Sequence, residues 1–457
     1  ADGFTVDDAC VVARLAEAAG ADAISASAYS GSSRGKGLVS GAAAMRPANY
    51  VPFAARIRRA VAIPVITAGR IELDVADRLL GDGEVDFIAM ARKLLAEPDL
   101  PSKLAEGRGG DVRPCIYCYT CISEVSLDRP VRCAVNGRTG RETAVDHMPT
   151  QAPRRVVVVG GGPGGMETAR LLDRMGHAVT LLEASGELGG TARIAAIAYE
   201  PNGRIVDWLK RQLAAGSVDV RLGHRATLDT IRALQPDAVV VAVGAARPRP
   251  PIPGNDLPHV YDGNDLRHLL TGDAAPGTGR AARTPLAARA LIGLGRKLGL
   301  VRSASVMRRA SQVWMPLGRR IVVIGGDLVG LELAEFLAHR RRTVTVIDET
   351  PRFGRGLAAL RRGAVLDECE TAGVTLIPGV SAIAIAGRKV TCTGPDGVAH
   401  AIPADHVILA CGATADRSLA EALRAEGLAT FTVGDCDGVG YIAGAMRDAA
   451  DVAARIG

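Results

Sequence analysis

The stretch that decides the fold is "RRVVVVGGGPGGMETARLLDRMGHAVTLLE", residues 154–183. Its run of valines predicts a buried strand, the glycines after it predict a tight turn, and the following segment has helical spacing. A second apolar run then ends at Glu183. Strand, glycine turn, helix and strand in this order predict an α/β unit that binds a dinucleotide.

Each glycine of the turn has its own expected task. Gly160 permits the tight turn, Gly162 lets the backbone approach a pyrophosphate, and Gly165 lets helix and strand pack closely. The helix N-terminus then faces the phosphates. Glu183 follows at the distance expected for a carboxylate that binds the ribose 2′-hydroxyl. We therefore expect a bound dinucleotide here.

The same plan returns in "RRIVVIGGDLVGLELAEFLAHRRRTVTVID", residues 319–348. Three landmarks recur at a constant offset of 165, with Gly160, Gly165 and Glu183 matched by Gly325, Gly330 and Asp348. A repeat at a fixed offset indicates an internal duplication. We expect a second dinucleotide in this copy.

The second copy departs from the first at Asp327, which stands where Gly162 is expected. A carboxylate repels a pyrophosphate unless its side chain turns away. Asp348 favours an unphosphorylated ribose, hence NADH over NADPH. The arginines at 340–342 precede that strand, so they are poorly placed to bind a 2′-phosphate.

Two further apolar strands, within residues 237–254 and 405–419, each end in a small glycine-containing turn where a chain can pass close to a cofactor. Near the C-terminus, "FTVGDCDGVGYIAGAM" places Asp435 ahead of a final helix. Together with the two glycine turns, these features predict a two-dinucleotide domain.

Four of the nine cysteines fall within 19 residues as C-x2-C-x2-C, eleven residues and C: Cys115, Cys118, Cys121 and Cys133. Three successive thiolates can surround one corner of an inorganic core, and a distant fourth closes it. This spacing favours a [4Fe-4S] cluster. Zinc is the alternative, although zinc sites usually pair two separate C-x2-C knuckles. The other five cysteines are interpreted as core residues.

The first hundred residues alternate helix and strand. Thr5 is the predicted N-cap of a helix over residues 6–19, and strands are predicted at 22–27, 64–69 and 86–91. Parallel pairing is expected from this alternation. Three strands cannot close a (β/α)8 barrel, which needs eight.

Composition narrows the class of protein. The 457 residues are 48% apolar and 23% charged, as in soluble proteins of two or three domains. No apolar run is long enough to span a bilayer and no signal peptide opens the chain, so a cytoplasmic location is expected. An odd number of cysteines with one dense cluster fits a reducing compartment.

The net charge of +6 is carried by one stretch, residues 274–320, which holds ten Arg or Lys and no Asp or Glu. Five apolar residues recur there at near-helical spacing: Leu286, Leu291, Leu294, Leu298 and Val301. The spacing predicts a basic amphipathic helix. We interpret it as a solvated cover between domains; a docking surface for a phosphorylated substrate, an acidic partner or a membrane is the alternative.

Taken together, these motifs resemble the iron–sulfur flavoenzymes of the old yellow enzyme class, the family of 2,4-dienoyl-CoA reductase and trimethylamine dehydrogenase. The resemblance implies an α/β fold: the C-terminal part of a (β/α)8 (TIM) barrel, an iron–sulfur loop, and a Rossmann-like, glutathione-reductase-type domain. It divides the chain into a partial barrel at 1–110, the cysteine segment and linker at 111–150, a FAD-binding domain at 151–262 and 410–457, a basic insert at 263–318, and a NAD(P)-binding domain at 319–409.

The resemblance also implies roles for single residues. "ITAGR" and "AMARKLLAEPDLP" suggest that Gly69, Arg70, Ala91 and Arg92 hold the FMN phosphate, the alternative being surface arginines that cap loops. The four clustered cysteines would bind [4Fe-4S]. FAD would be bound by Gly160, Gly162, Gly165, Glu183, Gly434 and Asp435. Gly325, Gly330 and Asp348 would face the nicotinamide nucleotide, although in some relatives this site holds only ADP.

The implied activity is that of an NAD(P)H-dependent flavin oxidoreductase. Electrons would move from NADH to FAD, to the cluster and to FMN, and an activated C=C bond of enoate or enoyl-CoA type would be reduced. Alternatives are an amine-type dehydrogenase running in reverse, a non-catalytic electron-transfer subunit, and a zinc-stapled nucleotide-binding protein.

The family's barrel strands one to five have no counterpart, because Ala1 lies near the helix before strand six. An incomplete sequence record is the first explanation. A split gene, with a second chain completing the barrel, is the other.

Overall fold

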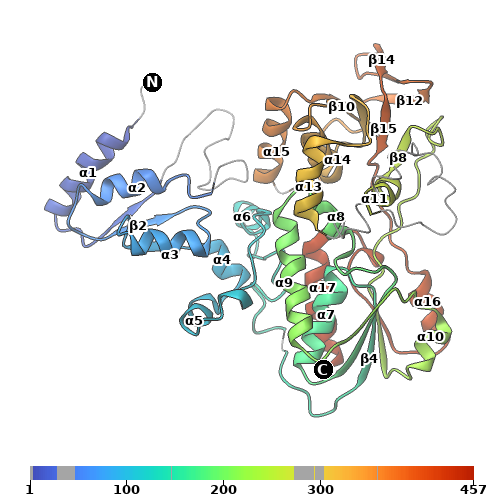
Figure 1. Ribbon diagram of the computed structural model, residues 1–457, viewed down its shortest axis with the longest axis horizontal. Helices are drawn as coiled ribbons and strands as arrows, with labels where there is room; N and C mark the ends of the chain where they lie inside the picture. Colours follow the sequence, from blue (N-terminus) through green and yellow to red (C-terminus); the bar gives the residue numbers. More distant parts are fainter. Residues whose placement is uncertain (1–3, 28–46, 146, 272–292, 294–302, 358) are drawn as a thin grey trace.

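The computed structural model describes residues 4–27, 47–145, 147–271, 293, 303–357 and 359–457 (Figure 1). The five apolar residues of the predicted basic helix all lie outside these residues. Among the described helices, none combines the length and apolarity needed to cross a bilayer.

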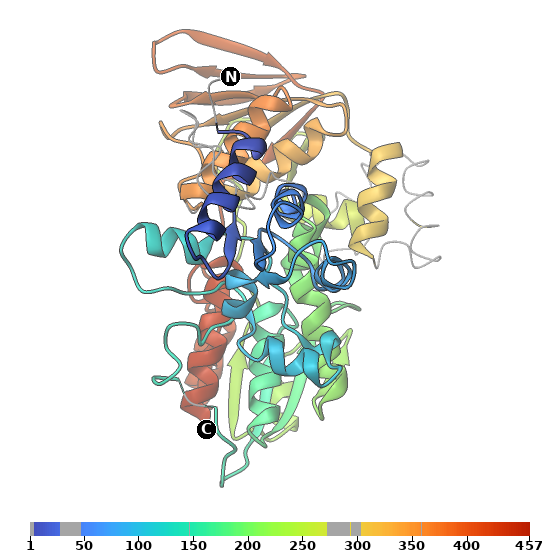
Figure 2. The ribbon, with the colours of Figure 1, turned by 90° about the vertical axis from the view of Figure 1, so that its left-hand side faces the viewer.

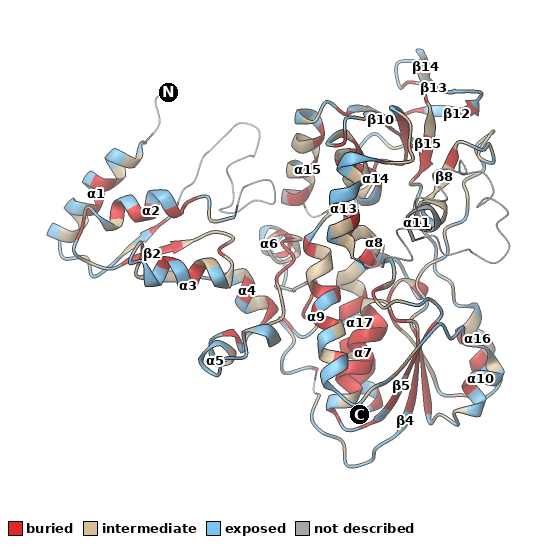
Figure 3. Cartoon of the chain, in the orientation of Figure 1, coloured by how far each residue is buried: buried red, intermediate tan, exposed pale blue. Residues whose placement is uncertain are grey.

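The N-terminal part is an open, parallel three-stranded sheet in the order β1-β2-β3. Its elements are α1 (Val6–Ala18), β1 (Ile24–Ala26), α2 (Val51–Arg58), β2 (Val65–Ala68), α3 (Leu73–Gly81) and β3 (Phe87–Ala89). The predicted cap is confirmed, since the Thr5 hydroxyl accepts from the Asp8 N–H. The helices cover the sheet incompletely, and Phe87 of β3 is 56% exposed. Much of this part is exposed in Figure 3.

Short helices lead from this sheet through the cysteine segment. They are α4 (Ala91–Ala96), α5 (Leu100–Ala105), a 3-10 turn (Gly109–Asp111) and α6 (Thr120–Ser126). The buried residues of the segment, among them Ile116 and Val135, share one hydrophobic core with α7, α9 and α17 of the next domain. The core of the N-terminal sheet is separate. The cysteine segment is thus packed as part of the first nucleotide-binding half.

The first nucleotide-binding half contains a parallel five-stranded sheet in the order β16-β7-β4-β5-β6. Its strands are β4 (Arg155–Val159), β5 (Ala178–Glu183), β6 (Asp219–Leu222), β7 (Ala238–Val241) and β16 (Thr430–Thr432). Its helices are α7 (Pro163–Arg174), α8 (Gly190–Ala198), α9 (Pro201–Ala215), α10 (Leu228–Ala233), α16 (Ser418–Ala425) and α17 (Tyr441–Ile456).

Helices cover both faces of this sheet (Figures 1 and 3). Val156 and Val158 of β4 belong to the core formed with α7 and α17. Val157 and Val159 belong to the core formed with α10 and α16. A strand buried on both faces is apolar at every position, which explains the unbroken run of valines.

The second half repeats this arrangement, with strand order β11-β10-β9-β15-β8. Its strands are β8 (Val260–Asp262), β9 (Arg320–Ile324), β10 (Thr343–Asp348), β11 (Thr375–Pro378) and β15 (His406–Leu409), and its helices are α11 (Gly263–Thr271), α13 (Ala304–Val313), α14 (Leu328–Ala338) and α15 (Ala359–Thr371). An antiparallel sheet is inserted, comprising β12 (Ser381–Ala386), β13 (Lys389–Thr393) and β14 (Ala399–Pro403). Figure 2 shows the second half above the first.

The chain crosses between the halves twice, and the two crossing segments pair at Ala246 and Thr414 through hydrogen bonds of 2.9 Å. After the first crossing, β8 joins the second sheet beside β15. The predicted boundary at residue 262 is therefore wrong for this strand, because it falls after the crossing instead of before it.

Each glycine turn contains positions that are packed too tightly for a side chain. A Cβ on Gly165 would lie 1.9 Å from the Gly160 carbonyl oxygen, and one on Gly330 would lie 1.9 Å from that of Gly325. Gly160 and Gly325 themselves have φ of +110° and +108°, a region that disfavours side chains. The two glycines that recur at an offset of 165 are therefore required by the same steric constraints in both copies.

We expect Gly165→Ala to lower stability by about 1–3 kcal/mol, because the methyl group must push α7 away from β4. Urea unfolding followed by circular dichroism measures the change. Gly203→Ala in α9 is the matched control, since its Cβ would meet only the Ala196 methyl at 3.4 Å. The control should be neutral or stabilising by up to about 1 kcal/mol. An equal loss of stability in Gly165→Ala and Gly203→Ala would contradict the steric argument.

Candidate functional site

A cavity of about 1940 Å³ lies between the two nucleotide-binding halves and reaches the cysteine segment. Seven of the residues predicted to bind a dinucleotide line it: Gly160, Gly162, Glu183, Gly325, Asp348, Gly434 and Asp435. Gly165 and Gly330 do not line it, although the resemblance implied that Gly165 binds FAD and that Gly330 faces the nicotinamide nucleotide. The position of Gly165 agrees with the packing role also expected of it. The structure thus brings both dinucleotide motifs to one space.

In the first turn, the Glu183 carboxylate accepts hydrogen bonds of 2.7 Å from the N–H groups of Gly161 and Ser185. The carboxylate therefore fixes the turn as well as facing the cavity. No atom lies within 4 Å of a Cβ placed on Gly162. This open position, at the N-terminus of α7, is where a pyrophosphate would need room.

The second turn is built in the same way. Asp348 accepts from the N–H groups of Gly326 and Thr350, the latter at 2.7 Å. The difference is Asp327, whose carboxylate accepts from the N–H groups of Leu328 at 2.9 Å and Gly356 at 2.8 Å. The Asp327 side chain thus turns back to cap α14. Its negative charge nevertheless remains at the helix N-terminus, where a phosphate would bind.

None of the three arginines before β10, at residues 340–342, lines the cavity. Arg340 donates to Ser311 Oγ at 2.7 Å and to the carbonyls of Phe336 and Arg308. Burial and the nearby Arg308 lower the pKa of Arg340 to about 10. Arg340 therefore anchors α13 to α14.

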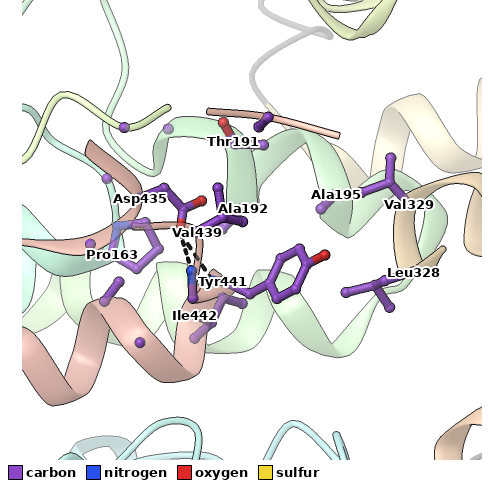
Figure 4. Close-up of a pocket in the computed structure, with 18 of the residues that line it drawn as sticks. Pro163, Thr191, Ala192, Ala195, Leu328, Val329, Asp435, Val439, Tyr441 and Ile442 are labelled. Carbon is purple, nitrogen blue, oxygen red and sulfur yellow. Dashed lines mark hydrogen bonds between the residues drawn. The ribbon is translucent and has the colours of Figure 1, made fainter. Parts of the chain in front are cut away.

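The start of α17 closes the cavity between the halves (Figure 4). Asp435 lies there, and its Oδ1 accepts hydrogen bonds of 3.0 Å from the N–H groups of Gly440 and Tyr441. Gly434 has φ +75° and donates its N–H to Asp448 at 2.9 Å. The "GD" pair is thus held rigidly at the cavity wall.

The four clustered cysteines line a second, smaller cavity. Burial raises the pKa of Cys115 to about 11 and that of Cys133 to about 12, and burial also raises the pKa of Cys121. As thiolates, these groups therefore need a strongly positive partner.

Among the described residues, no group of three or more His, Cys, Asp or Glu is close enough to hold a single metal ion. The four thiols share one cavity, and thiols are the ligand type that both a zinc ion and an iron–sulfur core require.

The two cavities share a wall. Ile116, Cys118, Cys133 and Ala134 line both. Two of the four thiols therefore stand between the dinucleotide cavity and the cysteine cavity.

On its other side, the cysteine segment contacts the N-terminal sheet through Tyr117, which is only 1% exposed. The Arg70 and Arg92 guanidinium carbons lie 4.5 and 5.3 Å from the Tyr117 ring centre. Arg92 also lines the cysteine cavity. These two arginines, predicted to hold a phosphate, therefore share one aromatic ring next to the thiols.

The other residues predicted for the phosphate are less enclosed. Gly69 has φ +111° and a Cβ there would lie 3.2 Å from the Tyr50 ring, while Ala91 begins α4. Gly69, Arg70 and Ala91 line neither of the two cavities. Thr67, 1% exposed at the end of β2, has a hydroxyl without a hydrogen-bond partner among the described residues. That hydroxyl fits a missing polar ligand at this end of the sheet.

Glu72 joins three parts of the chain. Its carboxylate accepts from the Tyr117 hydroxyl at 2.7 Å and from Arg204 of α9 at 2.8 Å, and it pairs with Lys93. Burial raises the pKa of Glu72, but these three partners outweigh it and hold that pKa at about 2. Sequence reasoning missed Glu72, Tyr117 and Arg204. The sole available signal was that Tyr117 lies within the cysteine motif.

Comparisons with known proteins place these features in a family context. The description "pyridine nucleotide-disulphide oxidoreductase" matches residues 203–436, about half of the chain. "NADH:flavin oxidoreductase / NADH oxidase family" matches residues 10–111, and "NAD(P)-binding Rossmann-like domain" matches residues 158–218.

Two curated relatives are 31% identical to the chain. Bilirubin reductase of Mediterraneibacter gnavus aligns over 84% of this chain and 54% of its own length. NADH oxidase of Thermoanaerobacter brockii aligns over 89% of this chain and 57% of its own length. The chain therefore spans about half the length of these relatives.

The solved structure of 2-naphthoyl-CoA reductase in complex with 2-naphthoyl-CoA superposes with a TM-score of 0.84 at 26% identity. The alignment covers 99% of this chain and 63% of that chain. The similarity thus extends over the N-terminal sheet, the cysteine segment and both nucleotide-binding halves.

We expect Glu72→Gln to lower stability at pH 7 by about 1–3 kcal/mol, because Lys93, Tyr117 and Arg204 lose a charged acceptor. A carboxylate with a depressed pKa stabilises the folded state above its ordinary value of 4.5, and this contribution is lost as pH falls toward about 2. The difference from the unsubstituted protein should therefore shrink below pH 4.5, as measured by urea midpoints across pH.

Glu84→Gln is the control for that series. Glu84 pairs with Arg78 at 3.6 Å on the surface of the same sheet, so its loss should change stability by less than about 1 kcal/mol. A Glu72→Gln deficit that stays constant down to pH 2 would contradict the assigned pKa.

We expect Asp327→Gly to tighten NAD⁺ binding by roughly tenfold, or 1.4 kcal/mol, because it removes a negative charge at the N-terminus of α14. Asp327→Asn keeps a capping side chain and should give a smaller gain, so the pair separates charge from space. Calorimetric titration of the full chain with NAD⁺ measures both. NAD⁺ affinity unchanged in both variants would show that Asp327 does not oppose the pyrophosphate.

Proposed function

Because the chain belongs to the pyridine nucleotide-disulphide oxidoreductase family and carries part of the NADH:flavin oxidoreductase / NADH oxidase family at residues 10–111, we propose that it is a multi-cofactor oxidoreductase that uses NADH to reduce an activated C=C bond. The predicted resemblance to old yellow enzyme class flavoenzymes is confirmed by these matches. The substrate class is an enoate or enoyl thioester, and the 2-naphthoyl-CoA reductase likeness supports a thioester.

One observation carries the proposal. The dinucleotide cavity borders the clustered cysteines, and the clustered cysteines border Arg70 and Arg92 of the N-terminal part. Cys118 and Cys133 line both cavities. Arg92 lines the cysteine cavity and stacks with Arg70 over Tyr117. This order is the one required by two flavin sites with a one-electron carrier between them.

We assign FAD to the first half, with Glu183 at the ribose, Gly162 at the pyrophosphate and Asp435 at the ribityl chain. NADH binds the second half at Gly325 and Asp348. FAD held there would supply the chemistry of accepting an electron pair from NADH, and a [4Fe-4S] cluster held by the four thiols would supply one-electron transfer between the two flavin sites. The chain's own contribution is to hold these groups in order and keep water from them.

The FMN phosphate is assigned to Arg70 and Arg92, with the backbone at Gly69 and Ala91. A guanidinium pair and backbone N–H groups both suit a phosphate dianion. The sheet that carries them is open, and Phe87 on β3 is 56% exposed. An open sheet edge and an exposed apolar surface of this kind favour aggregation unless other protein segments pack against them. We propose that further barrel strands, in the same polypeptide or in a second chain, provide it.

The nine cysteines are all free thiols, and the structure contains no disulfide among them. Five lie apart from the cluster, and four of these are buried in hydrophobic cores: Cys10, Cys369, Cys392 and Cys436. Unpaired buried thiols fit a reducing compartment. We accordingly place the protein in the cytoplasm.

The test uses the full chain purified without oxygen. We expect FAD, about four iron atoms per chain, and bleaching of the flavin absorbance by NADH. Cys118→Ser and Cys133→Ser should lose most of the iron but retain FAD, because the glycine turns are untouched. Cys392→Ala, in the core of the second half, is the matched control and should retain both.

Other outcomes would overturn parts of the proposal. Zinc in place of iron would mean that the four thiols form a structural zinc site without a role in electron transfer. FAD and iron without bleaching by NADH would favour an electron-transfer subunit, a candidate that Asp327 and the open sheet also support. Absence of FAD would end the oxidoreductase assignment.

A further inference from the structure

Tyr199, the residue at the C-terminal end of α8, contacts the cysteine segment. Its hydroxyl donates toward the carbonyl oxygens of Ile116 and Tyr117, at 3.1 and 3.2 Å. Both carbonyls lie between Cys115 and Cys118 in the sequence. Tyr199 therefore holds the backbone that joins two of the four clustered cysteines.

This contact fixes the direction of one backbone N–H group. The Ile116 carbonyl and the Tyr117 N–H belong to the same peptide unit, which is trans, so the two groups point in opposite directions. The Tyr117 N–H donates to Cys115 Sγ, with 3.5 Å between nitrogen and sulfur. Because the Tyr199 hydroxyl holds the carbonyl on one side of the peptide, it keeps the N–H on the other side directed at the sulfur.

The peptide needs such a contact because the residue after it has a strained backbone. Tyr117 has φ +52°, and bulky residues in this left-handed region are held there by their surroundings. The Tyr117 side chain is held by Glu72, whose carboxylate accepts from the Tyr117 hydroxyl at 2.7 Å. The Tyr117 backbone is held by Tyr199, through the carbonyl groups on both sides of the Tyr117 Cα.

The second nucleotide-binding half holds Tyr199 in turn. The guanidinium carbon of Arg361, in α15, lies 4.4 Å from the Tyr199 ring centre. Arg361 is 4% exposed and donates to Glu332 of α14 at 3.2 Å. A guanidinium shielded from water is attracted strongly by the face of an aromatic ring. The position of the Tyr199 hydroxyl thus depends on a residue from the other half of the molecule.

The hydrogen bond to Cys115 matters for an iron–sulfur core on these thiols. Cys115 lines the cysteine cavity together with the other three clustered cysteines. A reduced cluster carries more negative charge than an oxidised one, and an N–H group directed at a ligating sulfur stabilises that charge. Hydrogen bonds to the sulfurs are accordingly among the factors that set the reduction potential of a cluster.

We propose that Tyr199, held in place by Arg361, is a positioning residue that keeps the Tyr117 N–H directed at Cys115 Sγ and thereby raises the reduction potential of a cluster bound there. The inference rests on the proposed function, since it requires an iron–sulfur core on the four thiols. Neither Tyr199 nor Arg361 needs to touch that core, because both act through the peptide between Ile116 and Tyr117.

The first test is a potentiometric titration of the full chain, purified without oxygen and followed by electron paramagnetic resonance. Tyr199→Phe removes the hydroxyl and keeps the ring beside Arg361. At a fixed potential, the ratio of reduced to oxidised cluster should fall by roughly threefold to tenfold, and a tenfold fall corresponds to about 59 mV for one electron. Tyr261→Phe in β8 is the matched control and should leave the ratio unchanged, because the Tyr261 ring contacts His406 instead.

The second test asks whether Arg361 acts through the Tyr199 hydroxyl. Arg361→Lys keeps a positive charge beside Glu332 but loses the planar guanidinium that stacks on the ring. Alone, this variant should lower the ratio of reduced to oxidised cluster by a smaller factor than Tyr199→Phe. The double variant should match Tyr199→Phe, because the hydroxyl through which Arg361 acts is then absent. A further fall in the double variant would show an independent effect of Arg361 and overturn the coupling between the two residues.

Iron content separates the possible failures. Tyr199→Phe and Arg361→Lys should each retain about four iron atoms per chain, as in the unsubstituted protein. An unchanged or raised ratio in Tyr199→Phe at full iron content would overturn this inference alone. Loss of iron from Tyr199→Phe would mean that the hydroxyl retains the cluster instead of setting its potential, and would also overturn the inference. An unsubstituted chain without iron would overturn the proposed iron–sulfur site together with this inference.

Discussion

The docking of the cysteine segment onto the first nucleotide-binding half is the constraint on which the other sites depend. Arg113, just before Cys115, donates to the Val135 carbonyl at 2.8 Å, which ties together the two ends of the cysteine motif. The same guanidinium lies 3.2 Å from Glu167 of α7 and 4.6 Å from the Trp208 ring of α9. Glu167 is also paired with Arg170. Breaking one partner of such a buried group leaves an uncompensated charge and costs about 3–5 kcal/mol.

This docking decides the order of the sites. Because the segment shares its core with α7 and α17, packing fixes two of its thiols, those of Cys118 and Cys133, in the wall of the dinucleotide cavity. Its outward side carries Tyr117 and Tyr119, both almost fully buried and both in left-handed backbone conformations, with φ of +52° and +64°. These two strained residues turn the chain between successive cysteines and present their rings to Arg70 and Arg92. A single segment therefore connects two compartments that have separate cores.

The sequence was sufficient where the signal is local. The glycine turns with Glu183 and Asp348, the cap at Thr5 and the four spaced cysteines could all be predicted, because each depends on neighbours within one unit. Long-range contacts could not be predicted. Glu72 meets Tyr117 and Arg204 across 45 and 132 residues, and no local pattern records such a meeting. The pairing of β8 with the second sheet was missed for the same reason, since its three residues, Val260–Asp262, carry no local pattern that indicates which sheet they join.

The duplicated turns show which constraints come from packing and which come from a ligand. Gly165 and Gly330 are both compelled by a carbonyl oxygen 1.9 Å from the Cβ position, and both copies retain them. Gly162 and Asp327 face open space at the helix N-terminus, and there the copies differ. At Gly162 nothing within the protein would oppose a side chain, so the glycine is explained by what binds there. At Asp327 the protein supplies its own anion, bound to Leu328 and Gly356. A dinucleotide at the second turn would have to compete with this carboxylate for N–H groups at the N-terminus of α14, so we expect weaker binding there than at the first turn.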